Sequence, residues 1–278
     1  GYYGITHRLR SKEFELRSEL QRHIQKLLGI NVTFTYEFAR FNMIGVPNSG
    51  RVIREMIAKK ELIGWDDPSL TTIVALRRRG FLPEAIREFV ISTGITKTES
   101  TMTWDDLIVH NRRLLDKDAE RYFFVAEPVK IIIKGAPEQE VELDLHPTNK
   151  HGGRKFKTKE EFYISKTDID EIAKGKKGEL YRLMDCLNFS KKGKGFVFDS
   201  LEYTKYKDKG ARIMHFLPAG EGLINVEVMM PDKKIMKGLG EPLIAKLKEG
   251  DVIQAERFGF MRLDKKEKDK LSFWYTHQ

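Results

Sequence analysis

The sequence predicts a multidomain fold: the end of an α/β domain over residues 1–63, a small helical domain over residues 64–122, and an all-β region over residues 123–278. A strand-like opening followed by a helix indicates the α/β part. The helical repeat of apolar residues then continues until Tyr122, where it gives way to a repeat of two. Many short strands separated by turns are typical of barrels or sandwiches, so we expect two barrels in the last region.

The first domain begins with a short strand near His7 and a helix over residues 11–28. Gly29 ends this helix, and its apolar stripe consists of Leu16, Leu20, Ile24 and Leu27. The alternation of Phe34, Tyr36 and Phe38 predicts one strand over residues 33–43, followed by a loop at 45–50 and a helix through Val52, Ile53, Met56 and Ile57. The chain lacks an initiator Met and enters strand-like residues at once, so we expect a longer sequence before it.

The helical domain opens on Gly64-Trp65-Asp66-Asp67-Pro68. Asp66 or Asp67 is expected to cap a helix over residues 71–79, with Trp65 packed between the first two domains. Three consecutive arginines, Arg77, Arg78 and Arg79, end that helix, and they cannot all face one way. A second helix is predicted over 83–92, and a third begins after Thr103 with two acids in its first turn.

The all-β region is predicted from apolar alternation and from its turns. The expected strands are residues 129–133, 141–145, 162–164, 195–198, 213–216, 226–229, 252–263 and 271–275. Glycine and lysine dominate the turns between them, as at 192–195, 208–210 and 265–270.

Composition limits the class of protein. The chain has 278 residues, of which 40% are hydrophobic, and a formal net charge of +9, which suggests a polyanionic partner. The single Cys186 excludes a disulfide framework and a multi-cysteine zinc site, and it favours a reducing compartment. Neither an 18-residue apolar run nor a signal-peptide pattern occurs, so the sequence predicts a soluble, cytoplasmic protein without a membrane partner.

Most motifs for self-contained chemistry are missing from the sequence. It contains no Walker loop, no His-Glu-x-x-His, no Gly-x-Ser-x-Gly, and no Gly-x-Gly-x-x-Gly after a strand. The seven histidines show no metal-ligand spacing, so no protein-held metal is predicted. The residues alone therefore indicate no complete active site.

Three stretches carry a resemblance to a known family. They are residues 4–14 (GITHRLRSKEF), residues 36–42 (YEFARFN), and GWDDP at 64–68 with LRRRGF at 76–81. In this order and spacing the chain resembles the second half of a class I glutamyl- or glutaminyl-tRNA synthetase of the archaeal and eukaryotic type. The similarity continues through Arg121, residues 127–130 (EPVK), and His146-Pro147.

The resemblance implies the C-terminal remnant of a Rossmann catalytic domain, a helical connector, and all-β barrels that bind the anticodon. The family's first signature, His-x-Gly-His, lies in an N-terminal half that these residues do not include. The resemblance also implies that Ser11, Arg40 and Phe41 contribute to the ATP site. Ser11 before a helix is equally explained as an N-cap, and Arg40 as a surface cation.

The family's second signature is a Met-Ser-Lys-Ser or Met-Ser-Lys-Arg loop whose lysine stabilises charge on phosphates. Gap-free alignment places Asn48-Ser49-Gly50-Arg51 at this loop, so Gly50 stands where the family has lysine. The resemblance thus implies Ser49 and Arg51 as catalytic residues, with Asn48 and Gly50 binding nucleotide. Either Arg51 replaces the lysine, with Arg54 as a second candidate, or the loop is a structural turn without activation chemistry.

For tRNA, the family places an arginine that contacts the anticodon at the position of Arg121; a helix-terminal cation is the alternative. Arg77, Arg78 and Arg182 are further candidates. Other aromatic and basic residues on predicted strands suit unpaired bases, although a core position is the favoured explanation for the two phenylalanines, which share one strand face: Tyr181, Arg257, Phe258 and Phe260. The lysine-rich turns at 174–177 and 191–194 are interpreted as solvated loops, with contact to phosphates as the alternative for some of their lysines.

The sequence therefore predicts part of a glutamate–tRNA ligase. In the full enzyme, the resemblance implies ATP and Mg²⁺ as cofactors, with glutamate and ATP bound through the missing half and a glutamate-accepting tRNA as partner. The 278-residue chain alone is expected to bind tRNA without aminoacylating it. The alternatives are a non-catalytic tRNA-binding module or paralogue, and a fragment of a glutaminyl-tRNA synthetase.

Overall fold

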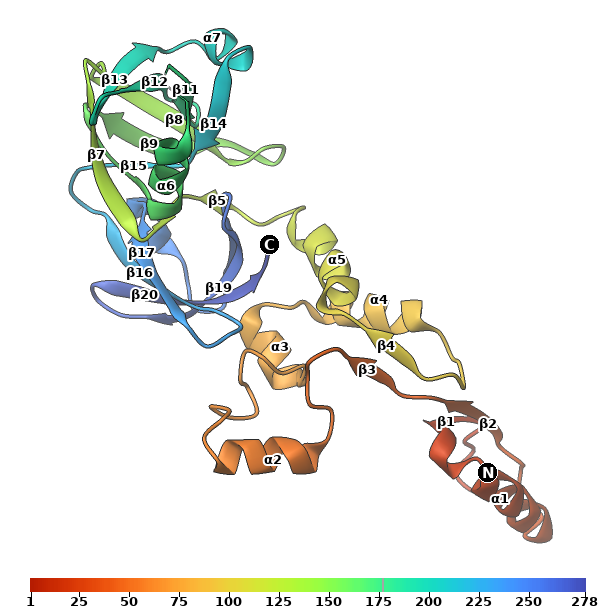
Figure 1. The fold of residues 1–278 in the computed structure, drawn as a ribbon. Helices are drawn as coiled ribbons and strands as arrows, with labels where there is room; N and C mark the ends of the chain where they lie inside the picture. The colour runs from red at the N-terminus through yellow and green to blue at the C-terminus, as the bar shows by residue number, and fades with distance from the viewer. Residues whose placement is uncertain (177) are drawn as a thin grey trace.

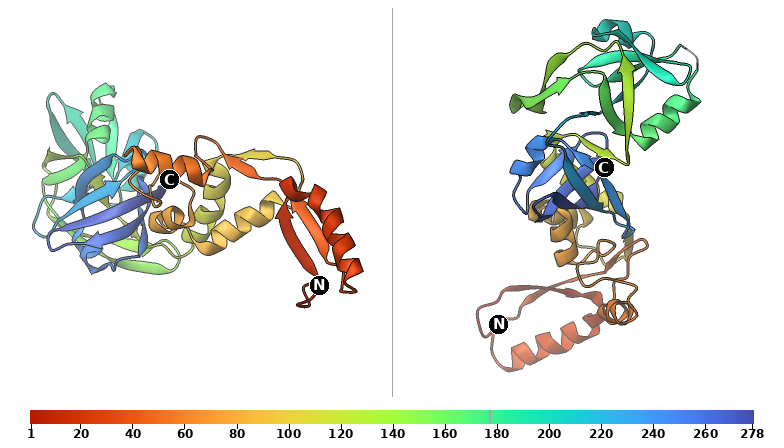
Figure 2. Two further views of the ribbon diagram at one scale, coloured as in Figure 1. Left: turned by 90° about the horizontal axis from the view of Figure 1, so that it is seen from below. Right: turned by 90° about the vertical axis from the view of Figure 1, so that its left-hand side faces the viewer.

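The protein is described by a computed structural model that covers residues 1–176 and 178–278. It is elongated: a small α/β unit lies at one end, two β domains lie at the other, and helices lie between them (Figures 1 and 2). Within the part of the chain that is described, none of the helices has the length and apolar character needed to cross a membrane.

The α/β unit is a strand–helix–strand arrangement. The parallel strands β1 (His7–Ser11) and β2 (Phe34–Phe38) are joined through a short 3₁₀ turn, η1 (Lys12–Phe14), and helix α1 (Leu16–Leu27). The expected strand over 33–43 is in fact two strands, because β3 (Phe41–Met43) leaves β2 and pairs instead with β4 (Ser100–Met102). Residues 39 and 40 connect β2 to β3, so the chain passes here from one two-stranded sheet to the other.

Helix α1 is oriented differently from an ordinary amphipathic helix. The stripe residues Leu16 and Leu27 are 93% and 72% exposed, whereas the polar Ser18 and Gln25 are buried. Ser18 donates to Glu37 of β2, and Gln25 exchanges hydrogen bonds with Thr33. The helix therefore meets its own sheet through polar groups, and its apolar face is uncovered in this structure.

The helical part consists of α2 (Gly50–Ala58), α3 (Ile73–Arg79), α4 (Pro83–Thr93) and α5 (Trp104–Leu115). The expected cap of α3 is wrong: the hydroxyl of Thr72, not Asp66 or Asp67, accepts the N–H of Ala75 at 3.2 Å. Asp67 is instead buried in the preceding loop, where it accepts the N–H groups of Ile63 and Ser69. At α5, the Asp106 carboxylate accepts the backbone N–H of Thr103, and this bond holds its pKa below the usual value.

The β region forms two seven-stranded sheets, each around its own apolar core. The distal domain contains β7 (Pro128–Lys134), β10 (Glu161–Ser165), α6 (Lys166–Lys174), β11 (Leu180–Leu183), β12 (Leu187–Lys192), β13 (Gly195–Ser200), α7 (Tyr203–Lys207), β14 (Gly210–Met214) and β15 (Leu217–Pro218), with the hairpin β8 (Gln139–His146) and β9 (Lys150–Thr158). The proximal domain contains β5 (Arg121–Tyr122), β6 (Phe124–Ala126), β16 (Ile224–Met229), β17 (Ile235–Gly240), η2 (Pro242–Lys246), β18 (Val252–Ala255), β19 (Gly259–Lys266) and β20 (Lys270–His277).

The distal domain is therefore an insertion between β6 and β16 of the proximal domain. Residues 122–125 lie between the two cores: Tyr122 and Phe124 pack into the proximal core, while Phe123 and Val125 pack into the distal one. The strand expected over 252–263 is two strands, because Arg257 has a positive φ of 62° and turns the chain between them. Helices α6 and α7 also interrupt the predicted run of strands, and residues 213–216 are likewise not one strand.

Candidate functional site

A cavity of about 890 Å³ lies between the α/β unit and the helical part. It gathers five of the candidate nucleotide-site residues: Arg40, Phe41, Asn48, Ser49 and Gly50. They come from the connection between β2 and β3, strand β3 itself, the loop before α2, and the first residue of α2. The structure thus brings together residues that the sequence places up to ten positions apart.

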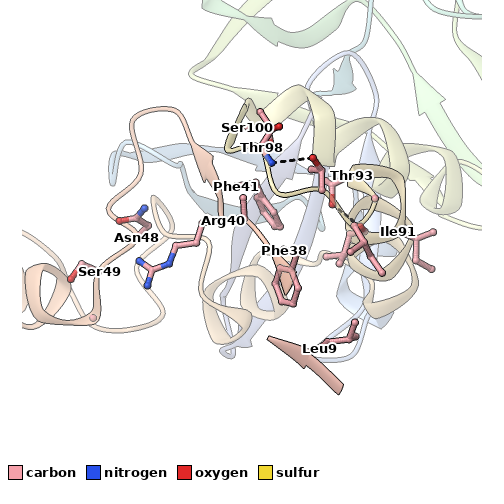
Figure 3. Close-up of a pocket in the computed structure, with 16 residues that line it drawn as sticks. Leu9, Phe38, Arg40, Phe41, Asn48, Ser49, Ile91, Thr93, Thr98 and Ser100 are labelled. Carbon is pink, nitrogen blue, oxygen red and sulfur yellow. Dashed lines mark hydrogen bonds between the residues drawn. The ribbon is translucent and has the colours of Figure 1, made fainter. Parts of the chain in front are cut away.

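The cavity has a polar end and an apolar end (Figure 3). Arg40 directs its guanidinium toward the Asn48–Ser49 loop, whereas Phe38, Ile91 and Leu9 lie at the other end. Arg40 also pairs with the Glu13 carboxylate at 2.9 Å, but its side chain remains 64% exposed. A cation at one end and an apolar wall at the other suit a ligand with an anionic part and an aromatic or aliphatic part.

The loop at the polar end leads directly into helix α2. Asn48 donates a side-chain hydrogen bond to Asn42 of β3, which ties the loop to that strand. Ser49 has the extended backbone of an N-cap, yet its hydroxyl caps no amide within the described chain. The first amides of α2 and the positive end of its dipole lie beside the cavity, which favours an anion there.

Ser11 and Arg51 do not line this cavity. Arg51 lies on the outside of α2, where its side chain is 84% exposed and pairs with Glu55 at 3.1 Å; Arg54 does not line the cavity either. Ser11 ends β1 at the N-cap position of η1 but makes no cap bond, and its buried hydroxyl has no partner among the residues described. Ser11 thus occupies the N-cap position without a capping hydrogen bond, and its buried hydroxyl lies outside the lining of the cavity.

One wall of the cavity was not anticipated from the sequence. Thr96, Thr98 and Ser100, with the end of α4, line another side of the cavity. The parallel pairing of Phe41 with Ser100 brings this wall to the site. No local signal in residues 94–100 predicts that pairing, because its partner strand is about sixty residues earlier.

The three consecutive arginines of α3 have three different environments. Arg77 is exposed, while Arg78 donates to both oxygens of Asp264 at 3.0 and 2.8 Å and also pairs with Asp66. Arg79 is 3% exposed and donates to three carbonyl oxygens, those of Pro68, Tyr275 and Thr276. Arg78 thus pairs with Asp66, one of the GWDDP carboxylates, whereas Arg77 stays exposed. Arg78 as a tRNA contact is not supported, because two carboxylates already hold it.

Trp65, expected to be packed between domains, is 43% exposed.

Arg121 lies in a second cavity, of about 330 Å³, between the two β domains. Both domains line it, with Glu142, Asp144 and Arg154 on the distal side and Glu256 beside Arg121 on the proximal side. The buried Nε of Arg121 has no hydrogen-bond partner in the described structure, and the ion pair of this guanidinium with Asp116 joins Nη2 to Oδ1 at 3.7 Å. An orphaned guanidinium donor in an interdomain cavity suits an acceptor from outside the chain.

Several other candidate tRNA contacts are internal. Arg182 is 6% exposed and donates to the Asn188 side chain and the Leu201 carbonyl, so it supports the distal sheet rather than an anion outside it. Arg257 pairs with Asp168, and Tyr181 is buried with its pKa raised to about 12 by burial and by Glu179. The core explanation holds for Phe260, and Phe258 packs partly buried against the proximal core. In the turn at 174–177, Lys174 pairs with Glu171, and Lys177 lies outside the described residues.

Comparison with known protein families matches three consecutive parts of the chain. Residues 2–117 match tRNA synthetases class I (E and Q), catalytic domain; residues 119–203 and 192–264 match two models of the anticodon-binding domain of the same class. The chain is also similar to proteins named glutamate–tRNA ligase. The one from Pyrococcus furiosus is 39% identical and that from Methanothermobacter thermautotrophicus is 36% identical, each over 99% of this chain.

The matches cover only part of those relatives. The alignments span 49% and 48% of the two relatives, so the chain spans about half the length of the curated relatives it matches. Within that half, the order of a catalytic part followed by two anticodon-binding parts agrees with the order of the α/β unit, the helices and the two β domains. The chain belongs to the class I tRNA synthetases of the glutamate and glutamine type.

Proposed function

We propose that this chain is the tRNA-holding half of a glutamate–tRNA ligase, which activates glutamate with ATP and transfers it to a glutamate-accepting tRNA. The observation that carries the proposal is the cavity of about 890 Å³, which assembles Arg40, Phe41, Asn48, Ser49 and Gly50 within the catalytic-domain match. In the same molecule, two domains that match anticodon-binding models lie at the far end. One chain thus joins a nucleotide-sized cavity to a tRNA-binding region.

The polar end of the cavity would take the phosphates of ATP. Arg40 would supply the positive charge, together with the amides at the start of α2, because Gly50 provides no side chain and Arg51 faces solvent. The apolar end near Phe38 and Ile91 would take the adenine or ribose.

Mg²⁺ would not be held by the residues of this cavity. Its described lining includes no carboxylate, and no group of three or more His, Cys, Asp or Glu side chains in the described residues has metal-binding geometry. Mg²⁺ needs oxygen ligands. A metal that enters with ATP would therefore be bound through the phosphates and through groups outside this chain.

The uncovered face of the α/β unit fits the same proposal. Leu16, Leu20, Ile24 and Leu27 expose an apolar stripe that α1 does not turn toward its own sheet. Relatives about twice as long have room for a further part of the catalytic domain. We propose that this part covers the stripe and supplies the glutamate site.

Arg121 and Arg77 would contact tRNA in different ways. The unpartnered Nε of Arg121 in the interdomain cavity suits hydrogen bonding or stacking with an unpaired base, which contributes about 1–3 kcal/mol per base. The exposed Arg77 suits a backbone phosphate, which holds the tRNA without reading its sequence.

A binding titration tests the proposal. The 278-residue chain should bind glutamate-accepting tRNA with an affinity that falls steeply with salt and falls again when the anticodon is replaced. Arg121→Ala should reduce the anticodon effect, whereas Arg182→Ala should not, because Arg182 is buried. If the chain binds both tRNAs equally, or if Arg121→Ala leaves the difference unchanged, the anticodon assignment is wrong.

A non-catalytic tRNA-binding protein is the second candidate. The observation that favours it is Gly50 in the second-signature loop, where the cavity has lost the family's lysine. The two candidates differ in the intact protein: a ligase catalyses glutamate-dependent exchange between ATP and pyrophosphate, and a binding protein does not. Arg40→Ala should abolish that exchange while leaving tRNA affinity within about twofold, since the cavity is remote from the β domains.

A further inference from the structure

The turn between β18 and β19 joins the two β domains through two neighbouring side chains of opposite charge. Glu256 and Arg257 belong to the proximal domain, and both reach the distal domain. Glu256 accepts from Nη1 of Arg154 on β9 at 2.8 Å. Arg257 donates through Nη1 and Nη2 to the two oxygens of Asp168 on α6 at 2.9 and 2.8 Å. We call these two residues the charged turn.

The distal partners of the charged turn are fully enclosed. The Arg154 side chain is 0% exposed and that of Asp168 is 1% exposed. Arg154 also donates to the buried Glu241 and lies over the ring of Phe123, in the segment shared by the two cores. Buried charges with several fixed partners cannot exchange them for water at low cost, so each contact holds one geometry.

Asp168 has partners from both domains. Arg212 of the distal domain donates to it at 2.8 Å, and the Ser165 hydroxyl donates to it at 2.8 Å. Burial raises the pKa of the Asp168 carboxyl, but Arg257, Ser165 and Arg212 outweigh this effect and hold it below its usual value. His215 faces Arg257 at 3.2 Å, with its other ring nitrogen on the Phe124 carbonyl. Arg257 thus links the proximal domain to Asp168, whose other partners Ser165 and Arg212 belong to the distal domain.

The charged turn also borders the cavity that contains Arg121. Glu256 and Arg121 line its proximal side, and Arg154, the partner of Glu256, lines its distal side. The width of this cavity therefore depends on how the two domains are held. Because the charges alternate along the turn, moving it by one residue would bring Glu256 to Asp168 in one direction or Arg257 to Arg154 in the other, and like-charge repulsion opposes either shift.

We propose that Glu256 and Arg257 are positioning residues for tRNA recognition, which fix the two β domains at the angle that shapes the Arg121 cavity. The inference rests on the proposed function, because it concerns how this cavity meets tRNA. Each domain has its own seven-stranded sheet and its own core, so the loss of Arg257 leaves both domains folded and changes only the angle between them.

Three variants of the arginines that pair with Asp168 test the inference. Arg257→Ala removes the interdomain guanidinium from Asp168, and Arg212→Ala removes an intradomain one. Arg257→Lys retains a charge but not the two-pronged contact. Alanine has the same Cβ as arginine, so the positive φ at position 257 adds no new strain. The domain angle is measured as the distance between spin labels attached in a Lys194→Cys, Lys268→Cys chain; both positions are exposed, whereas Cys186 is buried and stays unlabelled.

For Arg257→Ala we expect a broader distance distribution and a roughly tenfold loss of discrimination between glutamate-accepting tRNA and its anticodon variant, the size of one lost base contact. Arg212→Ala should keep both properties, and Arg257→Lys should recover part of them. An Arg257→Ala chain with an unchanged distribution, or with unchanged discrimination, overturns the inference. A wild-type chain that does not discriminate between the tRNAs overturns the proposed function and the inference together.

Discussion

The three consecutive arginines of α3 should respond to alanine substitution in a graded order. Arg79→Ala removes a buried guanidinium that donates to three carbonyls and lies 4.6 Å from the Trp104 ring. Hydrogen bonds to charged groups each contribute about 1.5–3 kcal/mol, and the truncated site leaves carbonyls unpaired. Part of the free energy of these hydrogen bonds offsets the cost of burying the Arg79 charge, and the same burial lowers the pKa of Arg79 to about 10. We therefore expect a net loss of about 3 kcal/mol.

Alanine substitution of the other two arginines should lower the free energy of unfolding by less. Arg78 is about one-third exposed, pairs with Asp66 and Asp264, and lies 4.0 Å from the Trp274 ring. A partly exposed ion pair and a cation–π contact together contribute about 1–2 kcal/mol. Arg77 is exposed, so Arg77→Ala should change stability by less than about 0.5 kcal/mol.

Urea unfolding followed by tryptophan fluorescence measures this order, because Trp104 and Trp274 lie under Arg79 and Arg78. The tRNA affinity should follow the opposite order among the folded variants, with Arg77→Ala lowering the salt slope by about one. Equal shifts of the unfolding midpoint for the three variants, or the largest shift for Arg77→Ala, would refute this account of the junction.

Three further outcomes follow from buried groups and from the loop before α2. Burial lowers the pKa of His215 and His277 to about 4, so the unfolded state binds more protons than the folded state between pH 6.5 and 4. The free energy of unfolding should therefore fall as pH falls through this window, by up to ~1.4 kcal/mol per pH unit for each histidine. His215→Gln should reduce that slope in urea melts, and an unchanged slope would contradict the assignment. Burial raises the pKa of the Cys186 thiol to about 12, so a thiol reagent at pH 8 should label it only in denaturant; rapid labelling of the native chain would argue against its burial. Gly50→Lys should fold normally, because a Cβ there meets only the Trp65 ring at 3.7 Å, and it should raise ATP–pyrophosphate exchange in the intact protein; no rise would show that the loop does not use a lysine.

Local patterns predicted most of the helices and many of the strands. The periodicity of residues 104–115 and the Pro83 and Gly94 boundaries are local signals, and the structure has helices there. The apolar stripe of α1 also predicted the helix, but not which face meets the sheet. That face depends on the pairs Ser18–Glu37 and Gln25–Thr33, which form only after the strands align.

Long-range partners explain what the sequence did not predict. Arg182 and Arg257 are of the residue type that binds nucleic acid, and the sequence alone therefore makes them candidates for tRNA contact. Their partners in the structure are instead the internal groups Asn188 and Asp168. Asp168 is 89 residues from Arg257, and the insertion of the distal domain between β6 and β16 brings them together. Arg40, Asn48 and Ser49 were proposed from the resemblance, and the structure places them at one cavity; it places Arg51 outside.

The most direct test of the account is glutamylation by the purified product of the complete gene that encodes these residues. With ATP and Mg²⁺ it should esterify glutamate, and not glutamine, to a glutamate-accepting tRNA, and Arg121→Ala should slow the reaction mainly through a weaker dependence on the anticodon. A product that binds tRNA but transfers no amino acid, or that transfers glutamine, would contradict the account.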